Sequence, residues 1–449
     1  MQKNPFHHLP DIKFLVGLIL ILDLLCIPLF SQAWGRESAP LTLDQAKAMA
    51  LENNPSPAAA LERIRQAREE VAQARAAFGP TLTSNLGYNY TEAVDAPAQD
   101  ETKHTAQVTA TQVLFDGFYR KYAALSAQYG EEIQTAALEE AQRLLSWSVS
   151  QAFVNVHLAR ENIRIAQSDM DFNQEQEQEA ALKQKLGTGS LSDRLNFQTK
   201  VISARSTLAD ARQEWTAARI GLAALLGFAD ARLPGGLELA PLPQPGDAGV
   251  QTDLKELADQ RPDLRQSRLN VDQAQAQVKM AQSEFYPTLS LTGGYGTTSG
   301  DHTLDTGDMG ASIGLSVNIT LFDGGSRTSK VRQARARKKE LEATLKSDEL
   351  TAMSQLRTGR AKIATARGKL DLQKENTQLI LKTRNLVEKE YQAGQVSLVR
   401  LNEAQNNLVT AQGNLAMARA DLALALEEFD YYSGGNIPAR PDQTQKERL

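Results

Sequence analysis

The side chains that most often do chemistry are scarce in this sequence. Its 449 residues include five His and a single cysteine, Cys26, beside 49 Lys and Arg and 54 Asp and Glu. His104 and His302 fall in segments that predict external loops, and His157 stands alone on a predicted helix. A lone His on a helix is much more often a packed side chain than a ligand or a general base. We therefore predict no catalytic residue, no metal site and no cofactor, and we do not expect an enzyme.

The overall charge excludes a further class of partner. The formal net charge is −5 at pH 7, so the chain has no basic excess that would attract nucleic acid. No glycine-rich phosphate-binding loop is present, and the Gly-Gly pairs stand where turns are expected. Any work that this protein performs must therefore draw its energy from a partner.

The N-terminal segment predicts an export signal. A mostly apolar run from Phe14 to Phe30 follows a polar start that contains lysine. Ser31 and Ala33 then place small residues where signal cleavage requires them. We predict cleavage after Ala33, which makes 1–33 a signal peptide.

Two alternatives for this segment remain open. One is a single transmembrane anchor, although the apolar run of about 17 residues contains Asp23 and is shorter than the ~20 needed to span a bilayer. The other is lipid attachment at Cys26, where Leu25 stands in place of the Gly or Ala that such sites prefer. Cleavage after Ala33 would remove the only cysteine and leave no thiol or disulfide in the mature chain.

The rest of the chain consists of two copies of one unit. Residues recur at a constant offset of 207 positions, so that Pro55 matches Pro262 and Gly187 matches Gly394. The offset does not change from 55 to 212, which indicates a tandem duplication without net insertion.

Proline and glycine positions mark the boundaries of the two copies. We predict a first repeat at 34–227, a linker at 228–252, a second repeat at 253–432 and a flexible tail at 433–449. The first repeat is expected to hold a β-hairpin at 80–116, a long helix at 118–186 and a return helix at 190–226. The second is expected to hold a hairpin at 287–323, a long helix at 326–393 and a return helix at 397–431.

The predicted helices are too long for a compact domain. A helix of ~68 residues is about 100 Å long, whereas the mean globular helix has about 11–12 residues. The helical faces are rich in Ala, Ser and Gln, which favours a wall of side-by-side helices over a thick core. Periodicity alone leaves open an extended coiled-coil rod.

The strands argue against a rod. In 311–321, apolar residues alternate with small uncharged ones, and 81–90, 105–114 and 288–295 repeat the pattern. Alternation over about 10 residues is typical of transmembrane β-barrel strands, with a soluble β-sandwich as the alternative. An export signal before four such strands favours the barrel.

One chain has too few strands to close that barrel. An open sheet edge is not tolerated in lipid, so closure requires other copies of the chain. Two copies give eight strands, a barrel filled by its own side chains, and three give twelve, with room for a pore. We therefore predict a mixed α and β membrane protein, in which a homotrimer shares a twelve-stranded β-barrel continued by a long α-helical barrel.

These residues resemble a known family, the TolC-like outer-membrane efflux proteins, over nearly all of 41–435. The resemblance rests on Leu41–Ala46, Asn54-Pro55, Phe78–Pro80, Phe285–Pro287, Leu321–Gly325 and the stretch from Ala393-Gly394 through Ala404-Gln405. The resemblance implies a passive trimeric channel with its β-barrel in the outer membrane of a Gram-negative bacterium and its helical tunnel in the periplasm. It also implies a periplasmic adaptor (membrane fusion) protein and an inner-membrane pump as partners, with outer-membrane lipid around the barrel.

The resemblance implies export of small molecules. Two other functions remain open: an outer-membrane conduit of a type I protein secretion system, and a coiled-coil structural protein of the envelope without a pore. The alternating strands argue against the second.

Glycines interrupt the long helices at the end farthest from the strands. Ser190 and Ser397 follow these glycines and are expected to be N-caps of the return helices. The resemblance implies that the two corners form the adaptor-docking tip, with an ordinary helix–turn–helix corner as the alternative. The predicted tip residues are Gly187, Thr188, Gly189, Ser190, Gly394, Gln395, Val396 and Ser397.

The resemblance also implies that acidic residues after the second tip narrow the channel entrance. Glu403 matches this pattern, but Arg400 stands where an acid is expected. Asp193 and Asn196 are the equivalent residues of the first repeat. We expect Arg400 to pair with Asp193 or Glu403 and hold the entrance shut, with a solvated helix face as the alternative.

Overall fold

The computed structural model describes two units of the chain. The described residues of the smaller unit are 40–42, 234 and 237–240, and in it Leu41 pairs with Leu239 in a parallel β-bridge. The larger unit holds the remaining residues. The predicted signal peptide and most of the predicted tail lie outside the described residues, which are 40–92, 101–234, 237–242, 253–299 and 309–435.

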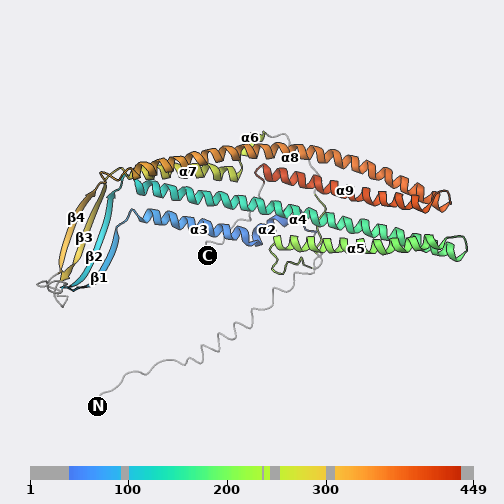
Figure 1. Ribbon diagram of the computed structural model, residues 1–449, viewed down its shortest axis with the longest axis horizontal. Coiled ribbons are helices and arrows are strands. Elements are labelled where there is room, and N and C mark those ends of the chain that lie inside the picture. The colour runs from blue at the N-terminus through green and yellow to red at the C-terminus, as the bar shows by residue number, and fades with distance from the viewer. Residues whose placement is uncertain (1–39, 93–100, 235–236, 243–252, 300–308, 436–449) are drawn as a thin grey trace, which may run out of the picture. The chain divides into compact units, whose positions relative to one another are not determined.

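The larger unit contains helices and strands from both repeats (Figure 1). Those of the first repeat are α2 (Leu43–Asn53), α3 (Pro55–Ala76), β1 (Thr81–Thr91), β2 (Glu101–Phe115), α4 (Tyr119–Lys185) and α5 (Leu191–Leu225). Those of the second repeat are α6 (Leu254–Asp259), α7 (Pro262–Ser283), β3 (Thr288–Ser299), β4 (Gly310–Asn318), α8 (Ser326–Gln392) and α9 (Leu398–Tyr432).

The strands form one antiparallel sheet in the order β1-β2-β3-β4. The pairing of β2 with β3 joins the two repeats, and β1 and β4 are the edges. The exposed apolar side chains include Leu82 at 74%, Leu86 at 78% and Ile313 at 82%. An apolar surface of this kind on a single chain indicates contact with lipid or another protein.

Two strand predictions need correction. β4 ends at Asn318 rather than at 321, because its partner residue is Thr288 and Pro287 before it has no N–H to extend the ladder. His104, predicted in an external loop, lies in β2 opposite Tyr88, and their ring centroids are 5.2 Å apart. The predicted loop residue His302 lies outside the described residues.

The turn that connects a strand to the long helix has the same structure in both repeats. Neither α4 nor α8 has a side-chain N-cap at the residue before it. Instead, Asp116 accepts hydrogen bonds from the backbone N–H of Arg120 and from its guanidinium, which lies over the ring of Phe78. Asp323 and Arg327 repeat this arrangement at the start of α8. This shared corner fixes where each long helix leaves the sheet.

The helices form a wall whose order differs between its two ends. Next to the sheet the neighbours run α3–α4–α7–α8, and towards the far end they run α5–α4–α9–α8. α4 and α8 each have 67 residues, which corresponds to about 100 Å. α8 therefore borders the wall along its whole length.

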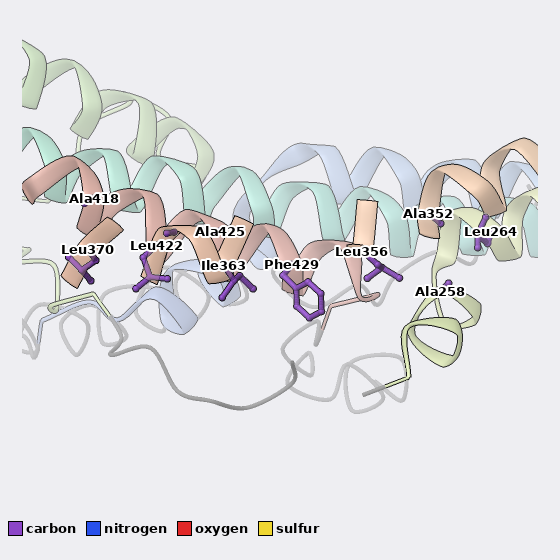
Figure 2. Packing of buried hydrophobic residues seen from close by; sticks show 11 residues of the cluster. Ala258, Leu264, Ala352, Leu356, Ile363, Leu370, Ala418, Leu422, Ala425 and Phe429 are labelled. Atoms are coloured by element: carbon purple, nitrogen blue, oxygen red, sulfur yellow. The ribbon is translucent and has the colours of Figure 1, made fainter. Parts of the chain in front are cut away.

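Buried residues follow narrow stripes along the helices (Figure 2). On α8, Leu356, Ile363 and Leu370 repeat every seven residues and pack against Leu422 and Phe429 of α9. Heptad spacing of this kind is the pattern of helices that pack side by side. The apolar interior is thin, as the Ala-rich and Gln-rich sequence predicts.

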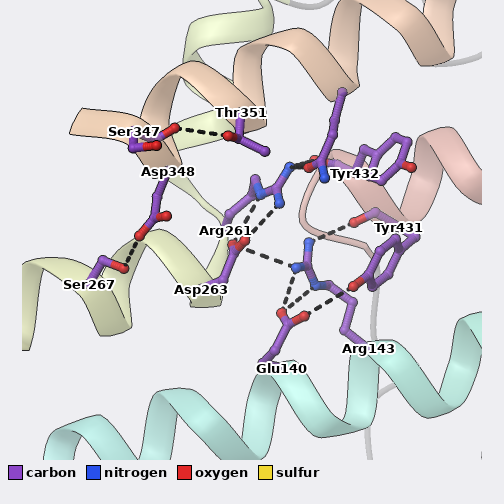
Figure 3. Close-up of polar contacts among 11 residues, drawn as sticks. Glu140, Arg143, Arg261, Asp263, Ser267, Ser347, Asp348, Thr351, Tyr431 and Tyr432 are labelled. Carbon is purple, nitrogen blue, oxygen red and sulfur yellow. Dashed lines mark hydrogen bonds and ion pairs between the residues drawn. The ribbon is translucent and has the colours of Figure 1, made fainter. Parts of the chain in front are cut away.

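Two buried arginines connect three helices (Figure 3). Arg143 of α4 donates a hydrogen bond to the carbonyl of Tyr431 at 2.7 Å, and Arg261 donates to that of Tyr432 at 3.4 Å. Arg261 also binds Asp263 of α7 at 2.7 Å. Burial alone would raise the pKa of Asp263, but Arg261 and then Arg143 hold that pKa below its ordinary value. The C-terminus of α9 is thereby attached to α4 and α7.

Replacement of Leu356 tests this helix contact. Leu356 is 0% exposed, so Leu356→Ala should destabilise the chain by about 2–5 kcal/mol through the cavity that it leaves. Thermal unfolding in detergent, followed by circular dichroism, measures the change. Leu144 of α4 is 50% exposed, and Leu144→Ala should cost no more than ~0.5 kcal/mol. Equal effects of the two substitutions would contradict the described contact of α8 with α9.

Candidate functional site

The corner between α4 and α5 is a tight turn closed by backbone hydrogen bonds. Gly187 has φ +75°, and the N–H groups of Thr188 and Gly189 both bind the carbonyl of Lys183. Nothing lies within 4 Å of a Cβ at Gly187, so its backbone angle and not crowding favours glycine there. Ser190 is the N-cap of α5, as predicted, and accepts a hydrogen bond from the N–H of Ser192 at 3.0 Å.

The corner between α8 and α9 repeats the turn with one change. Gly394 has φ +72°, and the N–H of Gln395 binds the carbonyl of Glu390 at 2.8 Å. Ser397 is the predicted N-cap and accepts from the N–H of Arg400 at 3.4 Å. Val396 stands where the first corner has Gly189. The two corners therefore share a backbone fold but present different side chains.

Exposed apolar side chains surround both corners. We call the corners and these side chains the tip surface. Leucine and valine here contact little of their own chain, although burial would stabilise them. The exposed fractions are 58% for Leu182, 69% for Leu186, 54% for Leu191, 52% for Leu195 and 74% for Val399.

The predicted entrance residues are only partly brought together. Arg400 pairs with Glu403 inside α9, at 2.9 Å between Nη1 and Oε2, and both side chains are more than half exposed. No described ion pair joins Arg400 to Asp193. Asn196 accepts a hydrogen bond from Asn402 at 3.1 Å, which links α5 to α9. Burial raises the pKa of Tyr391, and the carboxylates of Asp193 and Glu179 raise it further.

A layer of polar contacts above the tips was not predicted. Arg384 of α8 lies over the ring of Phe172 and donates to Gln405 of α9 at 3.0 Å. Gln405 in turn donates to Asp169 of α4 at 2.7 Å. Gln405 and Gln198 occupy equivalent positions of the two repeats. This repetition was the one feature of the sequence that pointed to the layer of polar contacts. The contacts join the two helical hairpins close to the entrance residues.

No described group of three or more His, Cys, Asp or Glu side chains is arranged to hold a metal ion. His157 packs within α4 against Phe153, at 5.0 Å between ring centroids. Across the same described residues, none of the helices has the length and apolar content needed to cross a membrane.

Comparison with known proteins identifies the family. A profile described as outer membrane efflux protein matches residues 48–228 and 254–435. The chain belongs to the outer membrane efflux protein family. One matched segment lies in each half of the chain. Members of this family are proteins of the outer membrane of Gram-negative bacteria that extend into the periplasm.

Relatives in this family differ considerably in sequence. Outer membrane efflux protein BepC of Brucella suis is 25% identical over 67% of this chain and 65% of its own length. Outer membrane protein TolC of Escherichia coli is 27% identical over 59% of this chain and 56% of its own. The chain thus spans less than two thirds of the length of these relatives.

Solved structures share the fold over most of the chain. The CmeC outer membrane channel of Campylobacter jejuni superposes with a TM-score of 0.79 at 19% identity, covering 90% of this chain and 88% of CmeC. The outer membrane protein VceC of Vibrio cholerae gives 0.76 at 18% identity, covering 88% and 96%. The four-stranded sheet joined to long helices is therefore the fold of this family.

Substitution of Gly189 tests the geometry of the first tip. A Cβ there would lie 2.7 Å from that of Lys183 and 2.9 Å from the backbone N of Gln184, so Gly189→Ala must displace the end of α4. We expect a loss of about 1–3 kcal/mol and faster trypsin cleavage after Lys183 and Lys185.

Val396→Ala is the control at the second tip, because its backbone already accommodates a Cβ. It should leave tryptic cleavage rates unchanged. A Gly189→Ala protein as resistant to trypsin as the parent would show that the described turn is wrong.

Proposed function

We propose that the protein is the passive outer-membrane channel-tunnel of a tripartite efflux system, and that it exports small molecules from the periplasm to the exterior. The observation that carries this proposal is the match of the efflux protein family to both repeats. The chain itself is proposed not to be an enzyme, so an inner-membrane pump supplies the energy for transport. A periplasmic adaptor protein connects that pump to the channel.

The edges of the single chain support a homotrimer. β1 and β4 leave unpaired N–H and C=O groups, which lipid cannot satisfy, so another copy must pair with each edge. Three copies of a four-stranded sheet make twelve strands, enough for an open pore. Outer-membrane lipid then contacts the exposed apolar face of the barrel.

The helical edges favour the same closure. Towards the tips, α8 exposes Leu372, Leu379 and Leu386 at heptad spacing, with exposed fractions of 55–68%. α5, at the other edge of the wall, exposes Leu195 at 52% and Ile202 at 68%. Two apolar stripes on opposite edges fit a ring in which α8 of one copy contacts α5 of the next.

The tip surface is proposed as the adaptor-docking site. It lies at the end of the helices away from the sheet, and it exposes apolar side chains that a protein partner would cover. The residues proposed for docking are Gly187, Thr188, Gly189, Ser190, Gly394, Gln395, Val396 and Ser397.

The names of relatives show that cargo differs within the family. Pseudomonas aeruginosa has a relative named pyoverdine export outer membrane protein OpmQ and another named alkaline protease secretion protein AprF. We favour small-molecule efflux over protein secretion, because the family that matches both repeats is described as an efflux family.

A combined test separates these functions. In planar bilayers, the purified protein should produce single-channel currents, and its deletion should sensitise the source cells to small toxic molecules. Loss of a secreted protein without any change in sensitivity would favour the secretion conduit. A protein that forms no channel would leave only a structural role in the envelope.

The entrance is proposed to be narrowed by Asp193, Asn196, Arg400 and Glu403. Because Arg400 neutralises Glu403, this entrance should select cations less strongly than a ring of unpaired acids. Arg400→Ala leaves Glu403 without its partner and should raise the permeability of K⁺ relative to Cl⁻ several-fold.

Reversal potentials in a KCl gradient across a planar bilayer measure that ratio. Glu403→Gln is the matched variant and should shift the potential in the opposite direction. If neither substitution moves the reversal potential, these side chains do not line the narrowest part of the path.

A further inference from the structure

The two outer helices of the wall next to the sheet carry both acids and bases, but each has one exposed row of like charges at heptad spacing, acidic on α3 and basic on α8. On α3, Glu62 and Glu69 lie seven residues apart, away from the buried stripe that packs on α4. On α8, Arg332, Lys339 and Lys346 repeat at the same spacing, away from the residues that pack on α7. All five side chains are exposed. We call these sets the α3 acidic stripe and the α8 basic stripe.

Most of these charges have no partner within the described part of the chain. Glu69 and the three cations of the α8 basic stripe make no hydrogen bond or ion pair with a described residue. Glu62 pairs only with Arg65, one turn further along α3, at 2.7 Å. An exposed pair of that kind contributes little to stability and exchanges readily for another partner.

The duplication supplies a template for what these stripes contact. By the offset of 207 residues, α3 is the counterpart of α7, and α4 is the counterpart of α8. The contact of α4 with α7 inside one chain is therefore the counterpart of a contact between α8 and α3 of a neighbouring copy. Inside the chain, Arg265 of α7 binds Glu139 of α4 at 3.0 Å, and Gln273 donates to the carbonyl of Ser126 at 3.0 Å.

The contact inside the chain also predicts the register of α8 against α3 of the neighbouring copy. Replacing each residue of the two observed contacts by its counterpart 207 positions away places Lys346 opposite Ala58 and Gln333 opposite Gln66. In this antiparallel register, Lys339 lies opposite Glu62, and Arg332 lies within one helical turn of Glu69. Arg332 and Lys339 are on the same face as Lys346, whose counterpart Glu139 makes the ion pair inside the chain.

The counterparts of the acidic stripe show that its positions become covered. Ala276, the counterpart of Glu69, is 3% exposed, and Leu269, the counterpart of Glu62, is half-buried. Gln277, the counterpart of the neighbouring Glu70, is exposed. The contact of α7 with α4 thus has apolar residues at the positions where α3 has acids. If these acids become buried against a neighbouring copy, they require opposite charges beside them.

We propose that the α8 basic stripe of one copy docks on the α3 acidic stripe of a second copy of this chain. This inference rests on the proposed trimeric channel and names the surfaces that meet in the half of the tunnel next to the barrel. Like charges repel, so a contact of the α8 basic stripe with itself is disfavoured, whereas the α3 acidic stripe offers it opposite charges. The ion pairs therefore select the head-to-tail arrangement that closes a ring.

Charge reversal tests the proposal on the full chain in detergent. Glu62→Lys with Glu69→Lys, and separately Arg332→Glu with Lys339→Glu, should each lower the temperature at which the trimer separates on a gel. The variant that combines all four substitutions should recover the parent temperature. Glu70→Lys is the matched control on α3 and should leave that temperature unchanged.

Either of two results would overturn the proposal: reversal on one helix without effect, or a fourfold variant no more stable than the twofold ones. Cysteine pairs then separate this proposal from the channel itself. Glu62→Cys with Lys339→Cys should yield covalent oligomers up to a trimer when treated with a short bis-maleimide. Glu139→Cys with Arg265→Cys should link only within one chain and remain a monomer on the gel.

A third pair, Leu195→Cys with Leu386→Cys, tests independently whether α5 of one copy contacts α8 of the next near the tips. If this pair gives a covalent trimer while Glu62→Cys with Lys339→Cys stays monomeric, the electrostatic contact is wrong and the channel stands. If both pairs stay monomeric in a protein that is itself a monomer, the proposed trimeric channel fails together with this inference.

Discussion

Unpaired backbone groups at the edges of a small sheet govern this structure. β1 and β4 lie at the two ends of the strand order, and in lipid their outward N–H and C=O groups have no water to bind. The apolar faces of the strands belong in the membrane, so the edges cannot simply be left in solvent. Each chain is thus one segment of a larger wall. The helices beyond the sheet must continue that wall and leave both of its edges open to neighbouring copies.

The turn between strand and long helix, present once in each repeat, extends the open-edged arrangement of the strands to the helices. The Asp116–Arg120 and Asp323–Arg327 corners each set a 67-residue helix on the sheet in the same way. The helices then pack through narrow apolar stripes, which leaves α8 as an edge from the sheet to the tips. The two halves of the chain are alike in backbone, yet their outward charges differ. Because of this difference, the contact between the two repeats of one chain is apolar where the contact with a neighbouring copy is charged.

Much of this architecture was predictable because repetition and periodicity encode it. The long helices, the alternating strands, the N-caps Ser190 and Ser397 and the glycine corners all depend on local sequence. The end of β4 was predicted too far along the chain, because the alternation continues past Asn318 although its partner strand does not. The tip and entrance roles remain proposals, because they depend on partners rather than on local sequence.

Contacts between distant segments were beyond sequence reasoning. Arg143 and Arg261 look like ordinary helix charges, yet they bind the last carbonyls of α9. Arg384 likewise gave no sign of its place beside Gln405. Long polar side chains are found on surfaces and in buried networks alike, and only the three-dimensional arrangement of the helices distinguishes the two cases.

The number of chains in the purified particle is the most direct test of closure by neighbouring copies. Native mass spectrometry of the protein released from detergent micelles gives that number without reference to transport. We expect three copies of the chain, held together without covalent links. A particle of one chain that stays soluble when the detergent is removed would contradict it, since the exposed sheet edges would then need no partner.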